Sequence, residues 1–238
     1  MKIAVLYSGG KDSTMTLYWC LKRGYDIKYL VTMMPKRGDS WMYHTPNIHL
    51  TELSAEAIGI PIITKQTSGI KEKEVEDLKD VLKVLDIDTV ACGGIFSNYQ
   101  KTRIEKVCKQ LKKKLLTPFW HTDSKQFLKE TIDLGFDVRI IGVYAAGFDE
   151  SWLGRKLDLK TLEDLIFLNK KYGISLVGEG GEYETLVVDG PIFKKKIRII
   201  DSEKIWDEKT QSGCLNIKKA ELVEKTSSLL LTSSKNIR

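Results

Sequence analysis

Residues 2–13 read KIAVLYSGGKDS, and this stretch decides the fold of the 238-residue chain. Lys2–Tyr7 is a short, mostly apolar run, which is typical of a buried parallel strand. Residues 12–23 then predict a helix, and Gly24 is placed to end it. A strand that passes through a glycine turn into a helix is the first unit of a parallel α/β sheet.

The same strand–helix alternation continues through the first half of the chain. Apolar runs predict further strands at residues 27–33, 61–64, 89–93 and 115–118. Amphipathic stretches between them predict helices at residues 45–59, 71–85 and 97–114. We therefore expect a parallel sheet with helices on both faces.

The second half of the chain is less regular and predicts a smaller α+β domain. Helices are expected at residues 123–134 and 159–172, and strands at residues 138–144, 184–188, 196–201 and 215–218. A loop that contains glycine and tryptophan occupies residues 147–154. The expected domain boundaries are 1–122 and 123–225, followed by a Ser- and Lys-rich tail, 226–238, that frays.

Composition excludes several classes of protein. The chain is 42% hydrophobic and 29% charged, as in an ordinary globular protein of one or two domains. The cysteines include no CxxC pair, which argues against a zinc knuckle, a disulfide framework or a thioredoxin-like redox site: Cys20, Cys92, Cys108 and Cys214. Neither a signal peptide nor an apolar run of about 18 residues is visible, so we expect a cytoplasmic protein with no membrane partner.

Positive charge is concentrated in the first half of the chain. Residues 1–118 contain 19 Lys and Arg against 13 Asp and Glu, whereas residues 119–238 contain 19 of each. A basic half indicates an anionic ligand, either a nucleotide or a nucleic acid.

The loop Ser8-Gly9-Gly10-Lys11-Asp12-Ser13 has the composition of a phosphate cradle. Glycines allow close approach of the backbone to a ligand, and the free N–H groups at the helix start point outward. Lys11 adds positive charge, and the two serines add hydroxyl donors. The loop is not a Walker A motif, because Val5 stands where that motif needs glycine. The alternative is a Gly-Gly turn in which Asp12 or Ser13 only caps the helix.

A second polar cluster, Gly93–Arg103, follows the predicted strand 89–93 and includes Gly94, Ser97, Tyr99 and Gln100. Ligands of open α/β sheets bind at the carboxyl ends of the strands, where the first loop also lies. Ser97 and Gln100 also form a capping box. Both interpretations can hold, because a capped helix start is also an anion site.

A third cluster, residues 178–185, is rich in glycine and glutamate. Between Ile174 and Phe193 the acidic residues are Glu179, Glu182, Glu184 and Asp189, and there is no Lys or Arg. Closely spaced carboxylates repel one another, which indicates a compensating metal ion, ammonium ion or cationic substrate. The alternative is a solvated hairpin turn.

These motifs resemble known families. SGGKDS after the first strand resembles the pyrophosphate loop of the N-type ATP pyrophosphatases, which cleave ATP to AMP and pyrophosphate. EGGEYETLV (179–187), GFDESWLG (147–154) and the 97–103 cluster occur in the order found in the diphthine–ammonia ligase (diphthamide synthase) family, in its short archaeal-type form. The resemblance implies a Rossmann-like sheet of the adenine nucleotide alpha-hydrolase-like (HUP) type.

The resemblance also implies roles for individual residues. Lys11, Asp12 and Arg103 would be catalytic, with Asp12 a contact for Mg²⁺. Met33 would lie by the adenine or merely fill the core, and His44 would reach the nucleotide or be structural. The remaining ATP-binding residues would be Ser8, Gly9, Gly10, Ser13, Gly93, Gly94, Ser97, Tyr99 and Gln100. Substrate-binding residues would be Asp149, Trp152, Gly154, Glu179, Glu182, Tyr183, Glu184 and Thr185.

The reaction implied by the resemblance is amidation of diphthine on translation elongation factor 2. ATP, Mg²⁺ and ammonium would be required, and an acyl-adenylate would precede diphthamide, AMP and pyrophosphate. Diphthine carries a trimethylammonium group, which the glutamates and Tyr183 could cradle; the same glutamates could instead hold or deprotonate ammonium. A homo-oligomer is compatible with the sequence.

The amino-acid sequence leaves two other functions open. A tRNA-modifying enzyme of the same superfamily would use the basic helix, since residues 101–116 hold seven basic residues and one acidic residue. The missing cysteine pair and the charge-neutral second half argue against it, so nucleic acid is not expected as a partner. A non-enzymatic ATP-binding sensor would need no second substrate site, and the acidic cluster argues against that.

Overall fold

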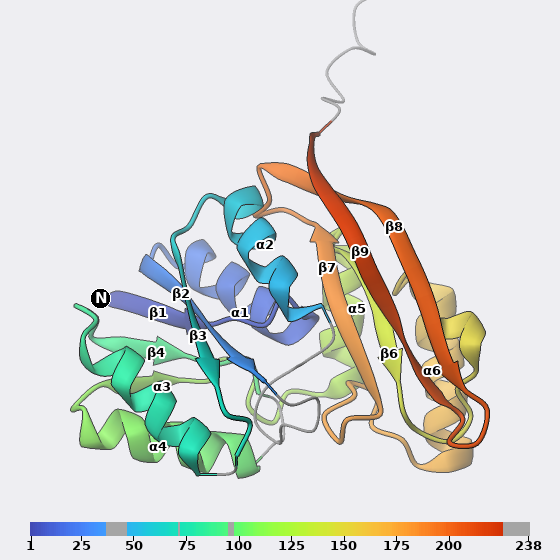
Figure 1. Cartoon of the computed structure of the whole chain (residues 1–238), viewed down its shortest axis with the longest axis horizontal. Coiled ribbons are helices and arrows are strands. Elements are labelled where there is room, and N and C mark those ends of the chain that lie inside the picture. The colour runs from blue at the N-terminus through green and yellow to red at the C-terminus, as the bar shows by residue number, and fades with distance from the viewer. Residues whose placement is uncertain (37–46, 71, 95–97, 226–238) are drawn as a thin grey trace, which may run out of the picture.

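A five-stranded parallel sheet is built by the first half of the chain (Figure 1). The computed structural model describes residues 1–36, 47–70, 72–94 and 98–225. Strands lie in the order β3-β2-β1-β4-β5, with bounds β1 (Lys2–Leu6), β2 (Asp26–Pro35), β3 (Ile62–Thr67), β4 (Thr89–Ala91) and β5 (Lys114–Leu116). The order reverses between β1 and β4, so the loops after these two strands border the crevice where such sheets bind ligands.

Helices cover both faces of this sheet, as predicted. The helices are α1 (Lys11–Lys22), α2 (Thr51–Ile58), α3 (Lys73–Lys83) and α4 (Asn98–Gln110). Side chains of β1 alternate between the faces: Ile3 packs in one core cluster with Met15 and Ala55, from α1 and α2. Its neighbour Ala4 belongs to a second cluster with residues of α3 and α4.

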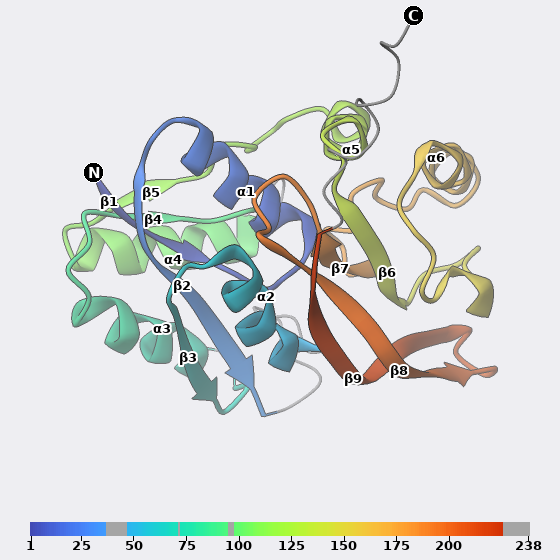
Figure 2. The same ribbon diagram turned by 90° about the horizontal axis from the view of Figure 1, so that it is seen from above.

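A second, antiparallel sheet has the order β7-β6-β9-β8. Its strands are β6 (Asp137–Val143), β7 (Tyr183–Asp189), β8 (Lys195–Asp207) and β9 (Ser212–Glu224). The helices α5 (Ser124–Asp133) and α6 (Leu159–Tyr172) lie together on one face of this second sheet (Figure 2). The short 3-10 helix η2 (Glu150–Trp152) lies in the loop between β6 and α6.

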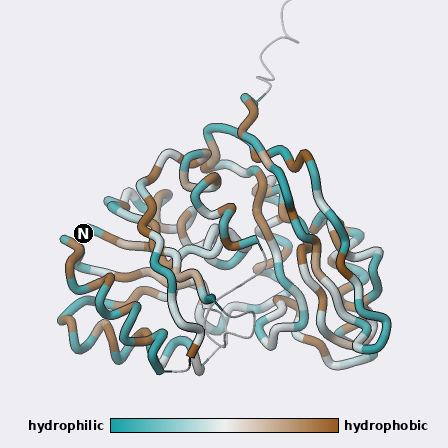
Figure 3. The backbone as a smooth tube through the Cα atoms, viewed as in Figure 1, coloured by the Kyte–Doolittle hydropathy of each residue, from teal (hydrophilic) through white to brown (hydrophobic). Residues whose placement is uncertain are grey.

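Several predicted bounds are corrected by the structure. β8 and β9 pair from Lys195 opposite Glu224 to Asp207 opposite Ser212, so both strands are far longer than predicted. Much of this hairpin is exposed and its tip is hydrophilic (Figure 3), so it has no apolar run to mark it. α4 ends at Gln110 because Lys112 adopts a left-handed conformation, with φ of 55°.

The helix expected from residue 45 divides into two elements. The 3-10 helix η1 (Ile48–Leu50) precedes α2, which ends at Gly59 with φ of 82°. The expected start at residues 45 and 46 lies outside the described residues, as does the tail 226–238. No helix in the part of the chain that the structure describes has the length and apolar character needed to cross a bilayer.

The two sheets share a core and are joined by hydrogen bonds. The larger hydrophobic cluster contains Val5 of β1 together with Leu186 of β7. The buried Asn47 amide donates to the Leu215 carbonyl (2.8 Å) and accepts from the Ile217 amide (2.9 Å). The Asn47 side chain, from the first half of the chain, thus forms hydrogen bonds with two backbone groups of β9 in the second sheet.

Replacing Asn47 by alanine is expected to weaken this junction. Asn47→Ala would leave the Leu215 carbonyl and the Ile217 N–H without their partner, which should lower the free energy of unfolding by about 2 kcal/mol or more. Urea denaturation would measure the loss. Asn216→Ala is the matched control, since Asn216 lies on β9 but is exposed; equal losses in the two variants would contradict the role of Asn47.

Candidate functional site

The Ser8–Ser13 loop connects β1 to α1 at the crevice of the parallel sheet. The Ser8 amide donates to Ser13 Oγ (3.2 Å), and Ser13 Oγ donates to the Gly10 carbonyl (3.1 Å). Gly9 has a φ of 78°, a conformation that favours glycine. These contacts hold the loop as a tight turn around the first residues of α1.

The N-terminus of α1 is capped from the second sheet. Gly10, the N-cap residue, makes no side-chain cap bond, and the Lys11 amide donates to Thr185 Oγ1 of β7 (3.2 Å). Beside it, the Val187 amide donates to the Gly9 carbonyl (2.8 Å). A helix start concentrates N–H donors and a positive dipole end, so β7 positions an anion-binding element.

Lys11 points inward and is 2% exposed. Its ammonium donates to the Val177 carbonyl (2.5 Å) and to Asp12 Oδ2 (3.0 Å). The ammonium also lies 5.1 Å from the centre of the Tyr183 ring, a cation–π distance. Three partners from both halves of the chain therefore surround one buried charge.

Burial and charge act in opposite directions on this group of side chains. Burial lowers the pKa of Lys11, but the Asp12 carboxylate and the other groups around it reverse this effect, and the Lys11 pKa lies above its ordinary value. Burial raises the pKa of Asp12 against the opposing effect of Lys11. Burial also raises the pKa of Tyr183 to about 12, so its hydroxyl stays protonated and donates to the Leu176 carbonyl (2.6 Å).

Asp12 also has a free acceptor that suits a magnesium ion shared with a ligand. Its Oδ1 atom is buried and has no hydrogen-bond partner among the described residues. Within those residues no three His, Cys, Asp or Glu side chains gather to hold a metal by themselves. Mg²⁺ is commonly held by one or two carboxylates plus substrate phosphates, which is the arrangement that Asp12 fits.

Gly93 brings the second predicted cluster against the first. A Cβ atom at Gly93 would lie 2.6 Å from the Asp12 carbonyl carbon and 2.7 Å from the Ser13 amide nitrogen. Gly94 faces open space. The predicted proximity of the two loops thus holds at Gly93, where the end of β4 lies in contact with the start of α1.

The other predicted nucleotide residues have contacts of their own or lie outside the described residues. Arg103 donates through Nε (3.0 Å) and a terminal nitrogen (2.6 Å) to Glu72, and this pair joins α4 to the start of α3. Met33 is buried in the core cluster beneath α3 and α4, and Gln100 is half-buried on α4. His44, Ser97 and the side chain of Tyr99 lie outside the described residues.

Side chains of the 178–185 cluster contact other parts of the protein. Both carboxylate oxygens of Glu182 accept backbone bonds, from Ser175 (2.9 Å) and Gly180 (2.8 Å). The Tyr183 ring contacts Lys11, and the Thr185 hydroxyl caps α1. Backbone N–H groups thus compensate the Glu182 carboxylate, and the Lys11 ammonium is the cation at the Tyr183 ring. Glu184 is half-buried on β7.

The predicted substrate residues of the 147–154 loop make contacts that hold the loop. Asp149 caps η2 by accepting from the Ser151 amide (2.8 Å). Trp152 is 6% exposed, with its ring 4.8 Å from that of Phe148. Gly154 has a φ of 86°, and its amide donates to the Ile140 carbonyl (2.8 Å).

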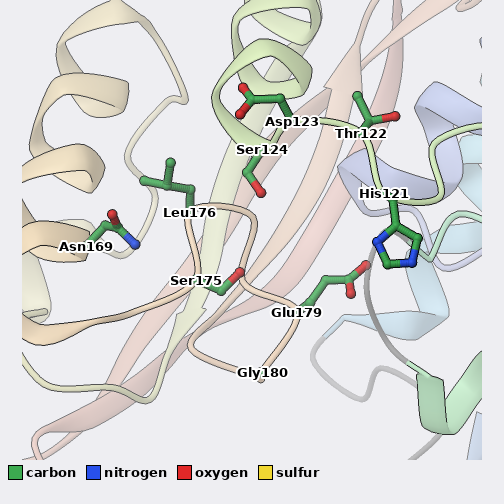
Figure 4. A pocket seen from close by; sticks show the side chains of 9 residues that line it. All are labelled: His121, Thr122, Asp123, Ser124, Asn169, Ser175, Leu176, Glu179 and Gly180. Carbon is green, nitrogen blue, oxygen red and sulfur yellow. The ribbon is translucent and has the colours of Figure 1, made fainter.

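An open cleft lies between the start of α5 and the turn that carries Ser175 and Glu179 (Figure 4). Its volume is about 770 Å³, and its lining includes His121, Asp123, Ser124, Asn169, Ser175 and Glu179. We name it the α5 cleft, because Ser124 begins α5. Of these residues only Glu179 was identified from the sequence; the others carry no motif and meet only in the folded chain.

Comparison with known proteins identifies relatives over most of the chain. A model of the diphthamide synthase N-terminal domain matches residues 1–115, and a model of its C-terminal domain matches residues 123–223. The chain is 37% identical to a diphthine–ammonia ligase of Homo sapiens, over 86% of this chain and 85% of the human protein. The Mus musculus protein of that name is 35% identical, over 96% and 95%.

The relatives differ in how much of their length the chain matches. A diphthine–ammonia ligase of Schizosaccharomyces pombe is 34% identical over 92% of this chain, but only 39% of the yeast protein. Among solved structures, a "predicted subunit of tRNA methyltransferase" from Methanocaldococcus jannaschii aligns with 80% of this chain and 100% of its own, at 18% identity and a TM-score of 0.45.

The approach of Gly93 to α1 leads to a stability prediction. Gly93→Ala would force the end of β4 away from the backbone of Asp12 and Ser13, and we expect unfolding to become easier by about 2 kcal/mol or more. Thermal and urea denaturation would measure the change. Gly94→Ala is the control because a Cβ there meets open space. Equal stability of the Gly93 and Gly94 variants would contradict the close approach of Gly93 to the backbone of Asp12 and Ser13.

Proposed function

The chain belongs to the diphthamide synthase family, and we propose that it amidates diphthine on translation elongation factor 2 with ATP and ammonium. The curated relatives named diphthine–ammonia ligase support this activity, because they form a C–N bond and match the chain over most of its length. We also propose a nucleotide-binding domain, 1–122, an acceptor-binding domain, 123–225, and a cytoplasmic location.

The observation that carries this proposal is the Lys11–Asp12 pair at the crevice of the parallel sheet. Lys11 is a buried cation, and Asp12 Oδ1 is a buried acceptor without a partner among the described residues. The start of α1 adds N–H donors beside them. This combination suits the phosphates of a nucleotide and an accompanying Mg²⁺ ion, which Asp12 would hold.

We propose that the Ser8–Ser13 loop binds the ATP phosphates and that Gly93 and Gly94 line the same crevice. Met33, His44, Ser97, Tyr99 and Gln100 remain proposed nucleotide contacts from the family resemblance. Arg103 would exchange Glu72 for a phosphate or adenylate group, since guanidinium groups bind both anions well.

The reaction would proceed in two steps at this crevice. The diphthine carboxylate attacks the α-phosphorus of ATP, pyrophosphate leaves, and an acyl-adenylate forms. Ammonia then attacks the acyl carbon, and AMP leaves as the amide forms. Lys11 and the α1 N-terminus would bind the anionic groups throughout, so positioning and charge neutralisation supply most of the rate enhancement. Mg²⁺, when bound, would offset charge on the phosphates.

The acceptor would approach from the second sheet. Glu179 and Glu184 remain proposed acceptor contacts, since their charge suits a trimethylammonium group. Glu182, Tyr183 and Thr185 would act indirectly, by holding the turn, Lys11 and the helix start in place. Asp149, Trp152 and Gly154 would shape the wall formed by the 147–154 loop.

The direct test combines the protein with Mg²⁺, labelled ATP, ammonium and elongation factor 2 that carries diphthine. We expect AMP and pyrophosphate rather than ADP and phosphate, and only when the factor is present. Mass spectrometry of the factor should show the hydroxyl of the carboxyl group replaced by an amino group. ATP binding without AMP formation in the complete mixture would overturn the proposed function.

The role of the loop is tested by Lys11→Met and Asp12→Asn. Each variant removes a charge at the proposed phosphate site, so we expect AMP formation to fall by about 100-fold or more. Lys22→Met is the matched control, because Lys22 is exposed in the last turn of the same helix. Far-UV circular dichroism and thermal unfolding would show that the variants fold. Turnover like that of the control in folded variants would contradict the assignment.

A further inference from the structure

The α5 cleft has the charge of a site for a cation. Glu179 contributes a carboxylate to its lining, and none of the described lining residues is Lys or Arg. The Asp123 carboxylate points away from the cleft (Figure 4) and caps α5 by accepting from the Gln126 amide (2.8 Å). Asn169, Ser124 and Ser175 add polar groups. The Asn169 amide donates to the Ile174 carbonyl (2.7 Å), which holds that side chain at the wall.

The cleft also has the size of a site for a side chain rather than for a small ion. Its volume of about 770 Å³ lies within the range of about 300–1,000 Å³ that is usual for ligand pockets. Figure 4 shows the His121 ring and the Glu179 carboxylate pointing toward one another at one end, while Ser124 and Ser175 extend into the middle. Carboxylates and aromatic rings attract quaternary ammonium ions, which cannot donate hydrogen bonds, and a neutral imidazole is a weaker ring partner than Trp, Tyr or Phe.

His121 is held out toward the cleft by an unusual backbone conformation. Its φ is 61°, in the left-handed region that few non-glycine residues adopt. The surrounding turn is closed by a hydrogen bond from the Thr122 amide to the Phe119 carbonyl (3.0 Å). The Trp120 ring packs edge-on at 4.9 Å from the His121 ring. Strained residues of this kind gather at functional sites.

The cleft and the nucleotide loop share one wall. Leu176 and Glu179 line the cleft, and Val177 between them accepts the hydrogen bond from Lys11 (2.5 Å). The negative charge of Glu179 also raises the pKa of Lys11. A ligand in the cleft is therefore separated from Lys11 by the thickness of a single turn.

We propose that the α5 cleft binds the trimethylammonium end of the diphthine side chain, with Glu179 as its counter-charge and the His121 ring as its second wall. This inference rests on the proposed function, which supplies the acceptor. The trimethylammonium group is thus placed in the α5 cleft and not at the Tyr183 ring, which already contacts Lys11. A side chain held there by its cation would present its carboxylate toward the Lys11 loop.

A binding experiment tests the cleft without any turnover. The wild-type protein is titrated with tetramethylammonium chloride, and with sodium chloride at equal ionic strength, while NMR follows the histidine ring protons. The chain has three histidines, and His121→Ala identifies the signal of His121. We expect tetramethylammonium, but not sodium, to shift this signal in the wild type and not in Glu179→Gln or Ser124→Lys. No shift of the His121 signal, or an equal shift with sodium, would overturn the proposal that the α5 cleft binds a quaternary ammonium group.

Kinetics then connect the cleft to the acceptor. For Glu179→Gln and Ser124→Lys we expect the KM for diphthine-bearing elongation factor 2 to rise by about tenfold or more, with the KM for ATP within about twofold of wild type. Glu163→Gln, on the exposed face of α6, is the matched control. An unchanged acceptor KM in folded variants would overturn the proposal. A wild-type protein that binds tetramethylammonium but never forms AMP would contradict the proposed function and leave the cleft as a cation site.

Discussion

The buried ammonium group of Lys11 is the constraint on which the site depends. A cation removed from water is stable only when charge and hydrogen-bond partners replace the lost solvent. Asp12 supplies the charge, Val177 a carbonyl and Tyr183 an aromatic face. Because Val177 and Tyr183 come from the second half of the chain, Lys11 can be buried only when the two sheets are packed together.

The turn that carries Val177 is itself fixed by a second polar contact. Glu182 accepts bonds from two backbone N–H groups of that turn, and its neighbour Tyr183 donates to the Leu176 carbonyl. From Tyr183 onward β7 pairs with β6, and Thr185 of this strand reaches the start of α1. This short acidic motif thus holds the turn, the Lys11 side chain and the start of α1 in place around the Ser8–Ser13 loop. Glu179 of the same segment is half-buried and lines the adjacent α5 cleft.

The structure adds protein partners that the sequence motifs did not predict. Glu182, which the sequence suggested as a contact for a cation, accepts bonds from backbone N–H groups. Arg103, which the family resemblance suggested as a catalytic residue, pairs with Glu72 at the start of α3. The Glu182 donors belong to the same turn, whereas Glu72 lies 31 residues before Arg103; in neither case does the local spacing of residues reveal which N–H group or carboxylate becomes the partner.

The parallel sheet, the helices on both of its faces and the place of the Ser8–Ser13 loop could be predicted from the sequence, because they follow from local apolar periodicity and from glycines that end helices or form turns. The length of the exposed β8–β9 hairpin could not, because it depends on strand pairing rather than on burial. Only the tertiary structure decided the contact of Gly93 with α1, the enclosure of Lys11 and the meeting of His121 with Glu179. Each of these joins residues far apart in the chain. The Gly93 contact forms when the strands of the parallel sheet pair, and the other two form only once both halves of the chain pack around their common core.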